Sequence, residues 1–262
     1  MLRFGMPTLI EAPSPEEAVQ LCKELSLDFV ELNMNLPQYQ AASFPLHRLK
    51  ELSEIHDIFY TFHLDENFNP FDFNPYVAGA WLKTLEESLQ LAGQLDCALL
   101  NLHLSRGVYF TLPESKTYLF SKYREEYLSA VQRMKAICDR AHKESGILIS
   151  VENTDGFLPF QREAIDLLLE SPAFTLTYDV GHDYCAGHID RDFILARKEK
   201  LSHIHLHDAS PAGCHLPLGD GLLDIDSLLE LAKETCSTVV LETKTLEGLQ
   251  KSVRRLRGQE PR

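Results

Sequence analysis

The chain has 262 residues, of which 44% are hydrophobic, and its formal net charge at pH 7 is −14. This length and apolar share are enough for one large core, and α/β barrels of this size fold as a single domain. An acidic chain without a basic run makes nucleic acid and anionic membranes poor partners. No apolar stretch approaches the length of a membrane-spanning helix, so no membrane partner is expected.

The N-terminal residues do not combine a basic segment with a following apolar stretch, so we expect no secretory signal. The chain has six cysteines, and none of them forms a close pair such as Cys-x-x-Cys. Both features are typical of reduced thiols and predict a cytoplasmic protein. The sequence leaves the oligomeric state open, a homo-oligomer included.

Strand and helix patterns alternate from one end of the chain to the other. Ser14-Pro15-Glu16-Glu17 supplies an N-cap, a proline at the first helical position and the glutamate of a capping box. The predicted strands are residues 3–7, 28–33, 58–63, 97–103, 147–152, 173–179, 201–207 and 237–242. The predicted helices are residues 14–25, 46–57, 74–93, 119–145, 160–170, 190–199, 225–234 and 246–256. Residues 104–118 are predicted to be a loop.

Eight consecutive strand–helix units predict a parallel (β/α)8 TIM barrel, with one domain over residues 1–262. The alternation of side chains along each strand supports closure. In residues 147–152, the large apolar side chains share one face, while Ser150 and Glu152 share the other. The apolar face packs under the helices, so the polar face is expected to point into the barrel.

Six predicted strands end in a side chain that binds metals or transfers protons, and these are His63, His103, Glu152, Asp179, His205 and Glu242. The C-terminal ends of the strands surround one point in a closed parallel barrel, so we expect a metal site at that face. Mixed carboxylates and imidazoles favour Zn²⁺ or Mn²⁺, with Mg²⁺ and Co²⁺ as further options. His182 and His215 follow on predicted loops at the same face. Eight candidates are too many for one ion, which indicates one or two metals together with substrate contacts.

Other interpretations of the same residues stay open. The four central candidates, Glu152, Asp179, His205 and Glu242, would also suit a structural ion-pair network. His63 and His103 suit ligation and ordinary hydrogen bonding in a pocket equally well. The remaining open positions are Lys244 (a substrate phosphate or a rim salt bridge), Glu31 (the pocket or local pairing), His203 (a hydrogen-bonded core histidine) and His207.

The motifs at these strand ends resemble those of the xylose isomerase-like barrel superfamily, which includes sugar-phosphate isomerases, epimerases and endonuclease IV. The matching motifs are Glu152-Asn153-Thr154, Asp179-Val180-Gly181-His182, His205-Leu206-His207-Asp208, residues 215–221 and Leu241-Glu242-Thr243. The resemblance implies that Glu152, Asp179, His205 and Glu242 hold a divalent metal. It also implies that Glu152 and Glu242 exchange a substrate proton through an enediolate, while His182 contacts substrate oxygens. His215, His63 and Lys244 are further candidates for substrate binding.

The expected function is therefore a metal-dependent isomerase or epimerase of a small sugar or hydroxy-carbonyl compound. The endonuclease branch is an alternative, because it uses additional ligands that match His63 and His103. That branch has an aspartate two residues before its match to His215, where this chain has Gly213, and the change removes a ligand of the third metal. A non-catalytic metal-binding barrel is the other alternative.

Overall fold

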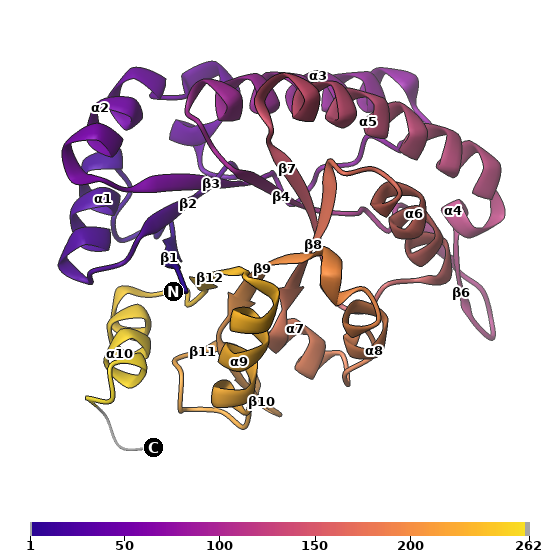
Figure 1. Ribbon diagram of the computed structural model, residues 1–262. Helices are drawn as coiled ribbons and strands as arrows, with labels where there is room; N and C mark the ends of the chain where they lie inside the picture. Colours follow the sequence, from indigo (N-terminus) through magenta and orange to yellow (C-terminus); the bar gives the residue numbers. More distant parts are fainter. Residues whose placement is uncertain (1, 260–262) are drawn as a thin grey trace.

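The computed structural model describes residues 2–259, and within them eight parallel strands close into a barrel surrounded by helices (Figure 1). The barrel strands are β1 (Phe4–Pro7), β2 (Phe29–Asn33), β3 (Phe59–His63), β4 (Leu99–His103), β7 (Leu148–Glu152), β8 (Phe174–Asp179), β9 (Leu201–Leu206) and β12 (Thr238–Leu241). Each strand pairs with its neighbours in chain order, and β1 closes the ring on β12. The predicted (β/α)8 TIM barrel is confirmed.

The helices lie outside the strands and cover the apolar face of each strand (Figure 1). They are α1 (Pro15–Glu24), α2 (Leu46–His56), α3 (Pro75–Gln94), α4 (Leu119–Lys122), α5 (Arg124–Ser145), α6 (Pro159–Leu169), α7 (Val180–Cys185), α8 (Arg191–Leu195), α9 (Ile225–Thr235) and α10 (Leu246–Leu256). Short 3₁₀ turns occupy Pro37–Tyr39, Ala41–Ser43 and Lys198–Lys200. The capping box predicted for the first helix is present, with the Ser14 side chain accepting from the N–H of Glu17 at 3.2 Å.

Several segments differ from the prediction. The stretch 104–118 is not a plain loop, because β5 (Tyr109–Thr111) and β6 (Lys116–Tyr118) form an antiparallel hairpin. A second hairpin, β10 (Asp208–Ser210) with β11 (Gly213–Leu216), follows β9. The helix predicted for 119–145 is broken at Tyr123 into α4 and α5, and the one predicted for 190–199 is only α8 followed by a 3₁₀ turn.

The predicted phase of the strands is also observed. Ile149 and Val151 are fully buried against the helices, whereas Ser150 turns inward and hydrogen-bonds Thr177 of β8 at 2.6 Å. Thr177 in turn donates to the side chain of Asn101 on β4 at 2.7 Å. These short polar side chains fill the inside of the barrel just below its C-terminal face. They therefore form the layer of side chains directly below the residues at the C-terminal ends of the strands.

Candidate metal centre

The parallel register brings four strand ends to one point at the C-terminal face. Asp179 of β8 lies opposite His205 of β9, and Val240, two residues before Glu242, lies opposite the same histidine. One ligand atom from each of Glu152, Asp179, His205 and Glu242 lies within 4.8 Å of the other three. Ligands around a single divalent ion at about 2.0–2.2 Å are separated by about 3–4 Å. The four residues thus fit one ion, with three carboxylates and one imidazole as donors.

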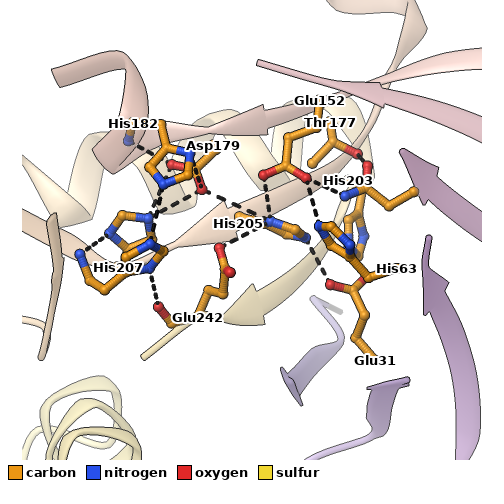
Figure 2. A network of polar contacts seen from close by, with 12 residues as sticks. Glu31, His63, Glu152, Thr177, Asp179, His182, His203, His205, His207 and Glu242 are labelled. Carbon is orange, nitrogen blue, oxygen red and sulfur yellow. Dashed lines mark hydrogen bonds and ion pairs between the residues drawn. The ribbon is translucent and has the colours of Figure 1, made fainter. Parts of the chain in front are cut away.

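His205 lies at the centre of this group (Figure 2). Its Nδ1 is 3.0 Å from Glu152 Oε1, 3.1 Å from Glu242 Oε2 and 3.9 Å from Asp179 Oδ2. Burial disfavours the charged imidazole, but the carboxylates of Glu152, Glu31 and Glu242 outweigh it and raise the pKa of His205 well above its usual value. Without a metal, a protonated His205 therefore supplies the positive charge that the surrounding carboxylates require.

The two glutamates remain ionised although both are buried. Burial would raise the pKa of Glu152, but His205 and His103 hold it well below its usual range. Glu242 follows the same pattern, because burial is opposed by His205 and by Lys244. Lys244 Nζ lies 2.9 Å from Glu242 Oε1, and its side chain is 58% exposed. The exposed lysine therefore reaches the centre from the solvent side.

His63 and His103 contact the carboxylate oxygen of Glu152 that His205 does not, and the ring of His63 stacks beside that of His205 with 5.8 Å between the ring centroids. The Nε2 atoms of His63 and His103 lie 3.2 Å and 3.0 Å from Glu152 Oε2, and their rings are nearly perpendicular. The side-chain amide of Asn101 donates to the same oxygen. Burial lowers the pKa of His63, but Glu152 more than compensates and raises it to about 9. Both histidines thus belong to the immediate surroundings of Glu152.

Asp179 begins a helix rather than a loop, and this corrects the prediction for the segment after β8. Its Oδ1 accepts from the N–H of His182 at 2.7 Å, so Asp179 is the N-cap of α7. The cap fixes the carboxylate and places His182 on the first turn, with Nδ1 3.6 Å from Asp179 Oδ2. Gly181 is required between them, because a Cβ at this position would overlap the ring of His207.

His215 stands on the β10–β11 hairpin with a left-handed backbone (φ 58°), which is uncommon outside glycine. Its Nδ1 donates to the carbonyl oxygen of Glu242 at 3.0 Å, which leaves Nε2 without a proton when the ring is neutral. Burial, opposed by Glu242, lowers the pKa of His215 to about 4. The bare Nε2 of His215 lies 3.2 Å from His182 Nε2.

The ring of His207 contacts the Asp179 carboxylate and orients it. The backbone N–H of His215 donates to His207 Nδ1 at 2.8 Å, so the ring proton of neutral His207 is on Nε2. That nitrogen lies 3.0 Å from Asp179 Oδ1. Ligand atoms of His182, His207 and His215 also lie within 4.8 Å of one another, which makes a second group of imidazoles beside the first.

All the sequence-predicted site residues lie at this face, and the two positions that the sequence left open, Glu31 and His207, contact the centre as well. Asn101, two residues before His103, donates to Glu152. The sequence left Glu31 open between the pocket and local pairing. Its register partner is Thr61, which lies two residues before His63 and therefore on the same face of β3 as that histidine, so the strand phase was the signal that favoured the pocket. His203 is a hydrogen-bonded core histidine as expected, and its partners are Thr238 and Glu31.

A family model of xylose isomerase-like TIM barrels matches residues 19–259. A D-tagatose 3-epimerase-like protein superposes with a TM-score of 0.79 at 23% identity, over 98% of this chain and 96% of that one. The 3-keto-D-glucoside 4-epimerase of E. coli gives 0.77 at 16% identity, over 98% and 100%. A structure of the IOLI protein with a bound zinc atom gives 0.71 at 13% identity, over 98% and 96%.

Within residues 2–259, no helix combines the length and the apolarity needed to cross a bilayer. The motifs at the strand ends, the closed barrel and the match over most of the sequence agree with one another. The chain therefore belongs to the xylose isomerase-like TIM barrel family.

Proposed function

We propose that this protein is a divalent-metal-dependent isomerase or epimerase, which moves a proton at a carbon beside a carbonyl group of a small sugar or hydroxy-carbonyl compound. The observation that carries the proposal is the placement of two ionised glutamates, Glu152 and Glu242, on either side of His205 Nδ1. Two carboxylates facing one point suit removal of a proton by one and its return by the other. The epimerase names of two solved structures with the same fold support this reaction class.

Glu152, Asp179, His205 and Glu242 would hold the metal, with Zn²⁺ or Mn²⁺ favoured and Mg²⁺ or Co²⁺ as further options. When bound, a divalent ion supplies Lewis acidity to neighbouring carbonyl and hydroxyl oxygens and so lowers the barrier to losing the proton between them. The protein then has to hold two carboxylates in register with the substrate carbon and keep water away from it.

The side chains around the two glutamates are proposed to have two roles, which are to hold the carboxylates in place and to bind the substrate. His63 and His103 hold Oε2 of Glu152, so this carboxylate can turn little as the proton moves. Lys244 holds Oε1 of Glu242 at the exposed rim, where it can also meet an anionic or hydroxyl group of the substrate. His182 and His215 present Nε2 atoms beside the centre and suit hydrogen bonds to substrate hydroxyls.

The test is solvent proton exchange. Protein loaded with Zn²⁺ or Mn²⁺ is incubated in deuterium oxide with a panel of ketoses, aldoses and their phosphates, and deuterium at carbon is followed by NMR. We expect incorporation at one carbon of one substrate class, with loss of the signal in Glu152→Gln and Glu242→Gln. A panel that shows no carbon-bound deuterium with either metal contradicts the proposal.

An abasic-site endonuclease is the second candidate, and the contacts of His63 and His103 with Glu152 favour it. Gly213 opposes it, because it stands where the endonuclease branch has an aspartate ligand, and so does the net charge of −14. Incubation of the same metal-loaded preparation with an abasic DNA duplex at low salt distinguishes the endonuclease from the isomerase or epimerase. Strand cleavage without carbon exchange would favour the endonuclease, and metal binding without either reaction a non-catalytic barrel.

A further inference from the structure

Glu31 is a buried carboxylate in the middle of β2, only 2% exposed, and it lies on the far side of the His205 ring from Glu152 and Glu242 (Figure 2). Its Oε1 is 2.9 Å from His205 Nε2. Its Oε2 is 3.1 Å from His203 Nε2 and accepts from the hydroxyl of Thr61 at 3.0 Å. Side chains of two other barrel strands, β3 and β9, therefore contact Glu31, and His203 links it further to Thr238 of β12.

We propose that Glu31 is a positioning residue that fixes the His205 ring with Nδ1 directed at the metal site. The inference rests on the proposed function in one respect, namely that His205 is a metal ligand. An ionised carboxylate offers only acceptors, so the His205 nitrogen beside it carries a proton. The other nitrogen, Nδ1, is then the one free to bind a metal, and it faces the carboxylates of Glu152 and Glu242.

The need for a carboxylate, rather than any polar group, follows from counting donors. His205 Nε2, His203 Nε2 and the Thr61 hydroxyl lie 2.9, 3.1 and 3.0 Å from the two carboxylate oxygens of Glu31. His203 and Thr61 make hydrogen bonds to it, whereas the contact with His205 is an ion pair without hydrogen-bond geometry in the metal-free protein. An ionised carboxylate offers only acceptors, so it suits all three of these groups. A glutamine in the same place offers one oxygen and one NH₂ group, so at least one of the donors would face another donor.

Glu31 is itself held in place. His203 Nδ1 lies 2.6 Å from the Thr238 hydroxyl, which fixes the histidine from the far side, and Thr61 fixes the carboxylate from β3. These partners are buried or half-buried, so water does not compete easily for the carboxylate. Outer residues of this kind fix the tautomer and the ring orientation of a ligating histidine, and their loss costs about 10–100-fold in metal affinity.

The first test compares Glu31→Gln with Asp190→Asn. Asp190 is also a fully buried carboxylate, but its partners are the N–H of Phe157 and the side chain of Arg162, away from His205. We expect Glu31→Gln to weaken Zn²⁺ binding by about 10–100-fold in a chelator competition and to change the visible spectrum of the Co²⁺-loaded protein. Asp190→Asn should leave both unchanged. Equal Zn²⁺ affinity and an identical Co²⁺ spectrum in Glu31→Gln and wild type would overturn the inference.

The second test needs no metal and no substrate. In crystals of metal-free protein, we expect the His205 ring of Glu31→Gln to rotate away from Glu152, while wild type keeps the present orientation. An unmoved ring in the variant contradicts the inference even if the protein proves to be no enzyme. Conversely, a wild type that binds no divalent metal defeats the proposed function, and the ring orientation still decides the role of Glu31.

A third variant applies if Glu31→Gln does not fold. Thr61→Val keeps the carboxylate and removes one of its three donors, so a smaller displacement of the His205 ring and a smaller loss of Zn²⁺ affinity are expected. Wild-type values for both measurements would count against the inference in the same way.

Discussion

At the scale of residues, the two candidate catalytic glutamates are held differently. Glu152 has a side chain only 1% exposed, with His63 and His103 on one oxygen and His205 on the other. Glu242 has a side chain 12% exposed, and its outer oxygen is held by the solvent-exposed Lys244. Glu152 is therefore the more firmly fixed of the two, while Glu242 has more freedom to turn toward a substrate.

This difference predicts the behaviour of Glu152→Gln and Glu242→Gln. Each removes one proton acceptor, so carbon-bound deuterium exchange should fall by about 10²–10⁴-fold in both. Zn²⁺ affinity should fall further in Glu152→Gln. Its buried amide NH₂ group would face the imidazole N–H groups that now point at the Glu152 carboxylate, and two donors cannot satisfy each other. Exchange assays and chelator competition on the two variants measure these effects. Retained exchange in either variant would remove that glutamate from the proton transfer.

The cysteines allow a simple test of burial. Cys22, Cys97 and Cys138 are buried thiols, and burial raises the pKa of Cys22 to about 12. Cys185 and Cys236 are exposed. In the native protein near neutral pH, a thiol reagent should therefore modify the two exposed cysteines first, since the thiolate is the reactive form. Mass spectrometry of the digested protein locates the label. Rapid labelling of Cys22 without denaturant would contradict the structure, and denatured protein, in which all cysteines react, serves as the control.

At the scale of elements, helix α7 connects the sequence motif to the centre. The motif Asp179-Val180-Gly181-His182 works as a cap followed by a helical turn, so the backbone itself fixes Asp179. Gly181 lets the ring of His207 approach this turn, and His207 in turn contacts Asp179. The glycine is thus a packing requirement, since its backbone does not have a positive φ.

Gly181→Ala should therefore destabilise the protein by about 1–3 kcal/mol, because the added methyl group overlaps the ring of His207. Zn²⁺ affinity should fall as well, since a displaced His207 no longer orients Asp179. The matched control is Gly79→Ala in the second turn of α3, where a Cβ would meet nothing within 4 Å. That change should stabilise the helix by about 0.5–1 kcal/mol. Urea unfolding of both variants measures the two effects, and equal stability of Gly181→Ala and wild type would refute the steric argument.

The strands of the barrel were predicted from the sequence, whereas several of the shorter elements were not. All eight barrel strands were predicted, because each is a short, mainly apolar run between helical patterns, and six of the predicted strands also carry an acid or a histidine near their ends. Helix α7 was missed, because its cap, Asp179, is also the last residue of β8. The hairpins β5–β6 and β10–β11 were missed since strands of three or four residues depend on their partner more than on their own composition. The break at Tyr123 was likewise not marked by any proline or glycine.

At the scale of the whole molecule, closure of the barrel is what makes the centre. Glu31 and Glu242 are far apart in sequence, yet both contact His205. The sequence predicted which strand ends would converge, because equivalent positions in a closed barrel surround one point. It did not settle whether Glu31, two residues before the end of β2, would reach the same centre, since that depends on how the strands are staggered around the barrel.

A metal at this point would join the ends of four neighbouring barrel strands, β7, β8, β9 and β12, so it should stabilise the fold. At a free Zn²⁺ concentration 100 times the dissociation constant, the expected gain is about 2.7 kcal/mol. The pKa of His205 is raised in the metal-free protein, so binding must release a proton, and the gain should grow as the pH rises. Thermal unfolding with Zn²⁺ or with a chelator, at about pH 6 and about pH 8, measures the effect. Glu242→Gln, which lacks one ligand, should show a smaller gain at both values. Identical unfolding curves with and without metal, at either pH, would mean that the four strand ends do not share an ion.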